Sequence, residues 1–184
     1  EDREKPKHRL YLDTFYIARY PVTNAEFAQF VATTGYRSSS DWQRYAGSGW
    51  ENHPVVTVTW RDAGAYAAWA GAHLPSEAQW EKAASWDPQP GVKRRWPWGD
   101  TWDEKRCNYG KSSKSVIGRS DRLSSRLRRL RRGRQGILPT TPVGSYSPKG
   151  DSQCNADDMA GNIWEWCSSI YSPYPYDQDD GRED

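Results

Sequence analysis

The segment "DDMAGNIWEW", residues 157–166, combines acidic residues, a Gly-Asn pair and two tryptophans within ten positions. An indole ring is costly to leave in water, and a carboxylate is costly to bury without a partner. In an extended chain, successive side chains point to opposite faces. The pattern therefore predicts that Trp164 and Trp166 enter the core together, while Glu165 points the other way, towards the loop that holds Asp158.

The composition predicts one domain, residues 1–184, with a core built from few but large side chains. The chain has 184 residues, 35% of them hydrophobic, and includes 11 Trp and 11 Tyr. A chain of this length can bury one full core. No stretch approaches the roughly 18 apolar residues of a membrane helix, and no signal peptide precedes Glu1. We expect a cytoplasmic domain, incomplete at both ends, because the chain opens and closes on charged residues.

Cysteine and histidine give few signals of a metal site. Cys107, Cys154 and Cys167 follow no CxxC spacing, and the histidines form no HxH or HExxH arrangement. A histidine-based zinc or iron site is therefore not expected. Two states of the cysteines stay open, namely a bridge between Cys154 and Cys167 or three free, buried thiols.

A basic insert at residues 111–136 interrupts an otherwise acidic chain. Two lysines and eight arginines face the single acid Asp121 between residues 111 and 134, a local charge of +9 that leaves about −7 for the rest of the +2 total. Leucines recur here at helical spacing, which favours a short amphipathic helix. The insert either binds nucleic acid or an acidic partner or is a solvated loop. The candidate arginines are Arg126, Arg128, Arg129, Arg131 and Arg132.

The first half of the chain carries the clearest secondary-structure signals. Alternating apolar residues predict strands within residues 8–23 and 54–60. Three helices are predicted, because three residue pairs match the capping-box pattern: Thr23 with Glu26, Thr59 with Asp62 and Ser76 with Gln79. Residues 87–176 show no long periodic segment outside the insert. A loop region of that length needs another organiser, such as bound metal ions.

Six segments of the chain occur in an order that resembles the formylglycine-generating enzyme (sulfatase-modifying factor) family. They are "FYIARYPVTNAEFAQFV", "HPVVTVTWRDAGAYAAWAGAHLPSEAQWEKAA", "WPWGD", "CN", "TTPVGSYSP" and "DDMAGNIWEWC". The resemblance covers nearly the whole chain except the basic insert. It implies a modified C-type-lectin fold, which is an α+β fold with small antiparallel sheets, a few helices and many loops.

The resemblance also implies a structural calcium site in the opening segment. Asp158 and Glu165 would supply side-chain oxygens, and Gly161 and Ile163 would supply backbone carbonyls. Several oxygens of this kind suit a hard cation such as Ca²⁺. The residues alone would equally allow a tight turn that leads into a buried strand.

A second family calcium site begins at the "CN" segment. There the resemblance implies the side chain of Asn108 and the carbonyl of Tyr109. The other family ligands fall where this chain has its basic insert, and Asp121 is the residue that could replace them. The second site is therefore a weaker expectation than the first.

Catalytic members of the family oxidise a sulfatase cysteine to formylglycine, using oxygen and copper held by a cysteine pair. That pair follows an "RGGSW"-type segment, and this chain has neither the segment nor a cysteine after Cys167. Carboxylates and tryptophans do not replace thiolates as copper(I) ligands. Related sulfoxide synthases take iron from a separate histidine-bearing domain, which is absent as well.

Two functions therefore remain for the chain as given. The first is a non-catalytic module that binds a protein or a small molecule, similar to retroelement variable proteins and to sensor domains of bacterial kinases. Tyr171, Tyr174 and Tyr176 would then form a contact surface, because exposed tyrosines contribute strongly to binding. The second is a fragment of a copper-dependent oxidase whose catalytic cysteines lie beyond Asp184.

Overall fold

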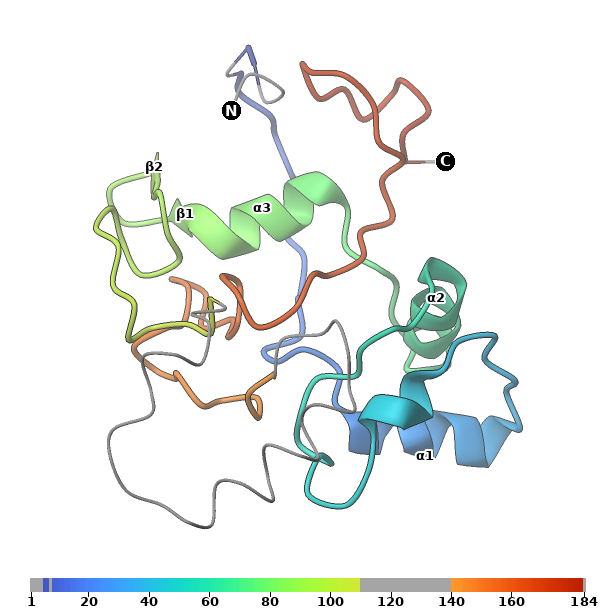
Figure 1. The fold of residues 1–184 in the computed structure, drawn as a ribbon. Helices are drawn as coiled ribbons and strands as arrows, with labels where there is room; N and C mark the ends of the chain where they lie inside the picture. The colour runs from blue at the N-terminus through green and yellow to red at the C-terminus, as the bar shows by residue number, and fades with distance from the viewer. Residues whose placement is uncertain (1–4, 7, 110–139, 184) are drawn as a thin grey trace, which may run out of the picture.

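The computed structural model describes residues 5–6, 8–109 and 140–183, and Figure 1 shows their path. Its elements are α1 (Asn24–Thr34), the 3₁₀ turn η2 (Trp42–Tyr45), α2 (Trp60–Trp69), α3 (Glu77–Ser85), β1 (Trp86–Asp87) and β2 (Val92–Lys93). The two strands form an antiparallel pair in which Trp86 faces Lys93. The rest of the described chain is turn and loop. The architecture is a loop-rich α+β fold, as predicted.

Each helix begins at its predicted capping box. At α1, the Thr23 side chain accepts a hydrogen bond from the Glu26 amide, and the Glu26 carboxylate accepts one from the Thr23 amide at 2.8 Å. The same reciprocal pairs start α2 at Thr59 and α3 at Ser76. α1 ends at Gly35, whose φ of 67° lies in the left-handed region that glycine adopts easily. The three predicted helix starts are therefore confirmed.

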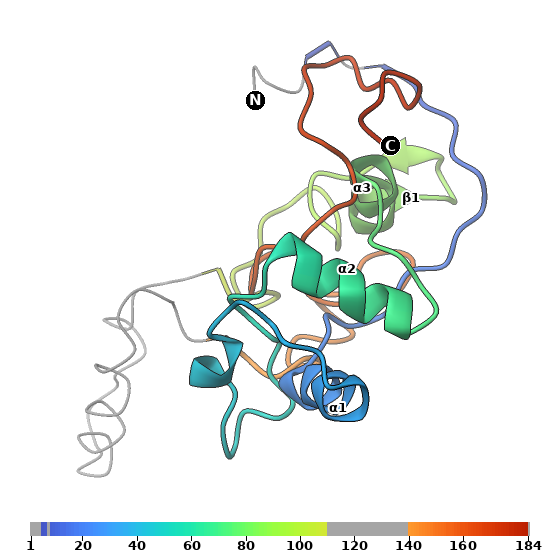
Figure 2. The ribbon, with the colours of Figure 1, turned by 90° about the vertical axis from the view of Figure 1, so that its right-hand side faces the viewer.

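The described residues bury two separate apolar clusters. In Figures 1 and 2, α1 and α2 lie together in one part of the molecule and α3 lies in another. The cluster below α1 consists of Phe27, Phe30, Trp42 and Val55, with Tyr66 of α2 packed against it. The cluster below α3 consists of Ala83, Ala84, Ala156 and Met159. The late loop that carries Met159 is thus fixed against α3, and this contact positions the site described below.

The prediction of strands at residues 8–23 and 54–60 is wrong. The described part of these segments forms a single isolated bridge, between Thr23 and Pro54. Leu10 is 37% exposed, whereas Phe15 and Ile17 pack against the cluster below α3. The alternating pattern is present, but a strand also requires a neighbouring chain at hydrogen-bonding distance along its length. The finer lectin-type sheet topology stays a prediction.

The three cysteines are free, so the bridge between Cys154 and Cys167 is not formed. Cys107 is buried and Cys167 is half-buried, but Cys154 is exposed, which corrects the expectation of three buried thiols. Within the described residues, no helix is long and apolar enough to cross a membrane.

Candidate functional site

A cavity of about 820 Å³ lies between α3, the loop after β2 and residues 158–167. Its wall includes Trp80 and Ala84 of α3 and Cys107 of the "CN" segment. The segments that the sequence singled out, although far apart along the chain, therefore meet around one hollow. This meeting makes the cavity the candidate functional site.

The floor of the cavity is a tight loop in which the backbone takes left-handed conformations. Asp158, Gly161 and Asn162 have φ values of 57°, 88° and 60°. The Asn162 amide donates to the Asn108 carbonyl at 2.8 Å. A Cβ atom at Gly161 would lie 2.4 Å from that same carbonyl oxygen. Only glycine allows such a close approach, which explains why the "CN" and "GN" segments can pack directly on each other.

Asn162 connects three parts of the site through its side chain. Its amide nitrogen donates to the Asp158 carboxylate at 2.7 Å and to the Thr141 carbonyl at 3.1 Å. Its amide oxygen accepts from the Thr141 backbone N–H at 2.9 Å. Sequence reasoning missed this role. The signal was the Gly-Asn pair, because asparagine tolerates left-handed backbone and bonds to nearby main chain.

Asp158 and Glu165 place two buried carboxylates at this loop, and neither has a basic partner among the described residues. Trp80 donates its indole N–H to Glu165 at 2.6 Å. Burial raises the pKa of Glu165, and the Trp80 hydrogen bond opposes that rise. Burial also raises the pKa of Asp158 to about 7; the Asn162 hydrogen bond opposes the shift, and the neighbouring carboxylates add to it. Neither acid pairs with a described lysine or arginine, so a cation or a proton would stabilise the site.

Aromatic rings form a second wall of the cavity. The ring centroids of Trp96 and Trp102 lie 4.6 Å apart, and Tyr109 meets Trp102 edge-on at 5.1 Å. Arg94 stands at the rim, where it is held by Asp87 at 2.8 Å and by Asp100 at 3.0 Å. The cavity therefore combines an apolar wall with an acidic floor.

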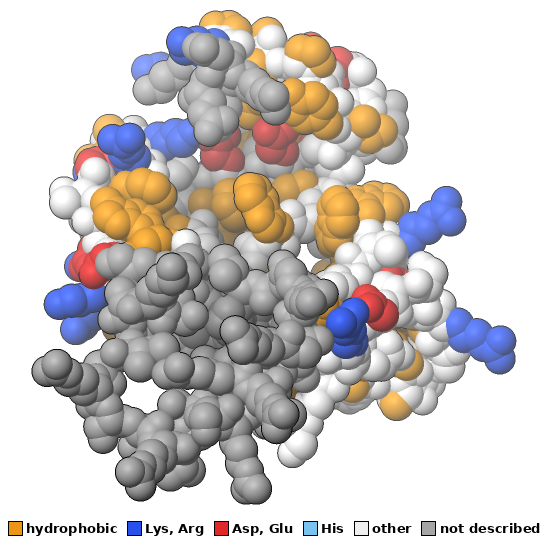
Figure 3. Space-filling view, viewed as in Figure 1, with side chains coloured by type: hydrophobic (Ala, Val, Ile, Leu, Met, Phe, Trp, Pro, Cys, Tyr) orange, Lys and Arg blue, Asp and Glu red, His pale blue; other side chains and the backbone are white. Residues whose placement is uncertain are grey.

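The two tryptophans of "WEW" do not enter the core. Trp164 is fully exposed and Trp166 is 49% exposed, whereas Glu165 is the residue that turns inward. The alternation is real, and Glu165 does point towards Asp158 as predicted, but the tryptophans lie on the outer face and do not enter the core. Trp80 supplies the buried hydrogen-bond donor that Glu165 needs, while Trp166 donates to the Val58 carbonyl at 3.0 Å. Figure 3 shows hydrophobic side chains in a band across the middle of the face that is drawn there.

Residues 1–182 match the family described as the sulfatase-modifying factor enzyme 1-like domain. The chain belongs to this family. The resemblance inferred from the ordered sequence segments is thereby confirmed.

Characterised relatives of this family cover almost the whole chain. Hercynine oxygenase of Mycolicibacterium thermoresistibile is 35% identical over 95% of the chain, which spans 40% of that protein. Formylglycine-generating enzyme of Streptomyces coelicolor is 34% identical over 95% of the chain, which spans 64% of it. The chain thus corresponds to about two fifths to two thirds of the length of these relatives.

A solved structure, that of PvdO from Pseudomonas aeruginosa, shares the fold. Its TM-score is 0.53 at 25% sequence identity, and the match covers 84% of the chain and 56% of PvdO. The fold of this chain is therefore shared with a solved protein and is not peculiar to this sequence.

The residues predicted for the first calcium site line the same cavity. Asp158, Gly161, Ile163 and Glu165 all contribute to its wall. The Gly161 carbonyl already accepts a hydrogen bond from the Ile163 amide at 2.8 Å. Within the described part of the chain, no group of three or more His, Cys, Asp or Glu side chains is placed to hold a metal ion. Calcium binding by these residues stays a prediction.

The second predicted site is only partly described. Asn108 and Tyr109 line the cavity too. The Asn108 amide donates to Asn162 at 3.3 Å, and the Tyr109 hydroxyl donates to Glu104 at 2.8 Å. Asp121 lies outside the described residues. The same holds for the insert arginines Arg126, Arg128, Arg129, Arg131 and Arg132.

The predicted tyrosine surface is divided between exposed and buried rings. Tyr171 is 82% exposed, but Tyr176 is only 7% exposed and its hydroxyl donates to Glu183. Tyr174 is half-buried and donates to Glu77 at 2.9 Å. Tyr171 is therefore the ring of the three that is most available to a partner, and binding at this surface stays a prediction.

Proposed function

We propose that this chain is the larger part of an oxidising enzyme domain, with its substrate bound in the cavity between α3 and residues 158–167. The observation that carries the proposal is the match of 95% of the chain, at 35% and 34% identity, to a hercynine oxygenase and a formylglycine-generating enzyme. These relatives favour the enzyme-fragment hypothesis over the non-catalytic module. We also propose that the domain has the C-type-lectin topology that the family resemblance implies.

The cavity has the properties expected of a small-molecule or peptide site. Its volume of about 820 Å³ falls within the range of roughly 300–1,000 Å³ that is usual for ligand pockets. Trp96 and Trp102 offer flat apolar surfaces, and such rings bury large areas of a ligand. The main chain of the tight loop at Gly161 fixes the opposite wall. A substrate could therefore be enclosed between an apolar side and a polar side.

The described cysteines do not fit a copper site. Burial raises the pKa of the Cys107 and Cys167 thiols to about 11 each, so both are protonated at neutral pH without a metal, and copper would have to displace both protons. Cys154 is exposed and donates to the Ala83 carbonyl at 3.4 Å. Copper(I) is held by thiolates. The oxidase proposal therefore assigns the copper ligands to sequence beyond Asp184, and the described residues serve to bind and orient the substrate.

Product analysis of the protein expressed from the complete gene tests the proposal. One reaction contains copper, oxygen, a thiol reductant and a cysteine-containing sulfatase peptide, and the other contains iron, oxygen, hercynine and a cysteine-type thiol as co-substrate. Mass spectrometry should detect either the formylglycine aldehyde or a sulfoxide in which hercynine is joined to the thiol. Absence of an oxygen-dependent product from both reactions would overturn the enzyme proposal.

A binding module is the second candidate function. The serine/threonine-protein kinase Pkn1 of Chlamydia trachomatis is 33% identical over 92% of the chain, which spans 25% of that kinase. The fully exposed Trp164 and the 82% exposed Tyr171 give such a module aromatic contacts. Saturable binding of a protein or small molecule that produces no chemical change, and that Trp164→Ala abolishes, would favour this candidate.

We also propose that a structural calcium ion binds between Asp158 and Glu165. The support is the pair of buried carboxylates, which lie without a basic partner among the described residues and have raised pKa values. Calcium prefers such oxygens and accepts backbone carbonyls as further ligands. The ion would stabilise the loop that forms the cavity floor.

A further inference from the structure

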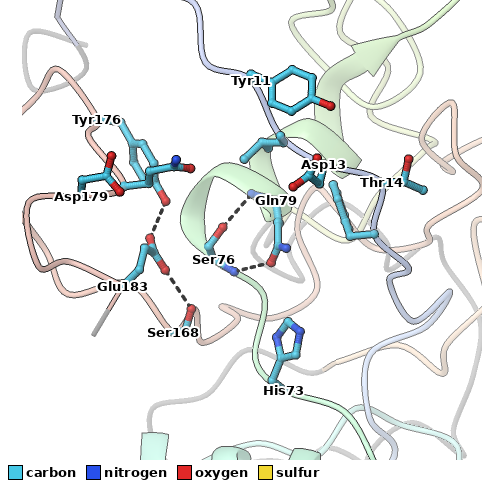
Figure 4. A pocket seen from close by; sticks show the side chains of 13 residues that line it. Tyr11, Asp13, Thr14, His73, Ser76, Gln79, Ser168, Tyr176, Asp179 and Glu183 are labelled. Carbon is cyan, nitrogen blue, oxygen red and sulfur yellow. Dashed lines mark hydrogen bonds between the residues drawn. The ribbon is translucent and has the colours of Figure 1, made fainter.

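A second cavity, of about 480 Å³, lies on another part of the molecule. Residues 11–15 form one side, the segment at the start of α3 forms the middle, and residues 176–183 form the other side. Figure 4 shows Tyr11 and Asp13 across from Tyr176, Asp179 and Glu183, with Ser76 and Gln79 between them. No residue lines both this cavity and the candidate functional site.

The charge of this cavity is negative and uncompensated among the described residues. Asp13, Asp179 and Glu183 line it, and no lysine or arginine does. Glu183 accepts hydrogen bonds from Ser168 at 3.2 Å and from the hydroxyls of Ser169 and Tyr176, all of which are neutral donors. None of the three carboxylates forms an ion pair with a described residue. Three like charges around one hollow attract cations from solution.

The basic residues close to the cavity contact its apolar lining but do not pair with its carboxylates. Lys82 lies beneath Phe15, with its ammonium 5.7 Å from the ring centroid, and donates to the Leu12 carbonyl at 3.4 Å. Arg182 stacks on Tyr176 at 4.6 Å but pairs with Asp180 at 2.7 Å. The carboxylates of the cavity are therefore left available to a ligand.

The aromatic part of the lining indicates an organic cation. Tyr11, Phe15 and Tyr176 contribute rings, and Leu12 contributes an apolar side chain. Ammonium groups are attracted to aromatic faces, and methylene chains pack on apolar surface. The described residues contain no group of three or more acidic, histidine or cysteine side chains placed to hold a metal ion. The volume also exceeds the space that one ion needs.

We propose that this cavity binds a linear aliphatic amine with two or three ammonium groups. Several positive charges on one flexible chain match three separated carboxylates better than a single cation does. The methylene segments would lie against Leu12 and Phe15, and the ammonium groups would reach Asp13 on one side and Asp179 and Glu183 on the other. This site is independent of the proposed enzymatic function.

Calorimetric titration with spermidine at low ionic strength tests the proposal. We expect saturable binding, with Asp13→Asn and Asp179→Asn each weakening it about threefold to fivefold, as for exposed charge pairs. Asp177→Asn is the matched control, because it removes one charge from the same segment but lies outside the lining. Its oxygen can still accept the Asp179 amide, now at 3.0 Å from Asp177 Oδ1. This control should bind spermidine like the unmodified protein.

Three results would overturn the proposal. One is the absence of saturable spermidine binding. Another is an equal loss of affinity in Asp177→Asn, which would indicate unspecific attraction to acidic surface. The third is equal binding of butane-1,4-diol, a neutral molecule of related shape, because recognition would then not depend on charge.

Discussion

Asp62 combines two tasks in a single buried side chain. It is 1% exposed and accepts hydrogen bonds from the Thr59 amide and hydroxyl at 2.8 and 2.7 Å and from the Tyr36 hydroxyl at 3.1 Å. Burial alone would raise its pKa, but these bonds together outweigh burial and lower it. The carboxylate therefore caps α2 and at the same time ties the chain before η2 to that helix.

Asp62→Asn should lower the free energy of unfolding by about 1–3 kcal/mol, because one buried donor would then face an amide nitrogen. The folded-state pKa of Asp62 is depressed, so its stabilisation exists above the unfolded pKa and is lost as pH falls through the folded pKa. The difference between the two proteins in urea denaturation should therefore be largest at neutral pH and shrink in acid. Glu26→Gln, at the exposed acid in the capping box of α1, is the control and should cost less.

Gly161→Ala tests the close contact between the "GN" and "CN" segments. The added Cβ would lie 2.4 Å from the Asn108 carbonyl oxygen, and φ at this position is 88°. Since backbone must move, we expect a loss of about 2–4 kcal/mol, above the roughly 1 kcal/mol typical of left-handed backbone alone. Gly35→Ala isolates the cost of left-handed backbone, because φ is 67° there but no atom lies within 4 Å of the added Cβ. Equal losses in thermal denaturation would contradict a steric role for Gly161.

The helices could be predicted from sequence because their signals are local. Thr23 and Glu26 are three residues apart, and the bonds that they form depend on little else. The strands could not be predicted from alternation alone. Residues 8–23 alternate as a strand would, but their described neighbours offer a single bridge, at Thr23. Whether a partner chain lies beside a segment is a property of the whole fold.

The sequence singled out segments that meet in the structure, but it did not predict which side chains of the last segment turn inward. The segments around Asn108 and Asp158 do meet at one cavity. The direction of Glu165 depends on Trp80, 85 residues earlier in the chain, which provides its buried donor. A period of two separates the faces of a strand, but it does not say which face is buried. The hydrogen bonds between Asn162 and Thr141 could not be predicted either, because they join residues that lie far apart along the chain.

The packing of α1 depends on Phe27, an aromatic residue on its buried face. Phe27 is 1% exposed and meets Phe30 at 5.5 Å and Trp42 at 5.1 Å between ring centroids. Phe27→Ala should destabilise the fold by about 3–5 kcal/mol, because it removes these contacts and leaves a cavity. Tyr16→Ala, at a fully exposed ring, should change stability little. A small effect of the Phe27 variant in chemical denaturation would show that α1 is not packed as described.

At the scale of the whole molecule, hydrogen bonds between loops join distant parts of the chain, as β-sheets do in other folds. The Asp157 amide donates to the Arg19 carbonyl at 2.7 Å, and the Ser168 amide donates to the Pro75 carbonyl at 2.8 Å. Such single bonds join the late loops to the first half of the chain without regular structure. The buried acids Asp157 and Asp158 lie in these loops, at 1% and 6% exposure. Their repulsion opposes folding unless a cation or protons reduce it.

Calcium should therefore stabilise the whole protein, because an ion bound only by the folded state shifts unfolding by mass action. At a concentration about a hundred times Kd the gain is about 2.7 kcal/mol, or roughly 5–10 °C in Tm for a chain of this size. Differential scanning fluorimetry should show Tm falling with EDTA and recovering with calcium. Burial raises the pKa of Asp158 to about 7, so protons compete with the ion and the calcium-induced shift should shrink as pH falls below that value. Asp158→Asn should abolish the calcium-induced shift in Tm. Asp157→Asn, at the adjacent buried acid, is the control and should retain that shift. A Tm that does not change with EDTA or calcium would exclude a structural ion at this loop.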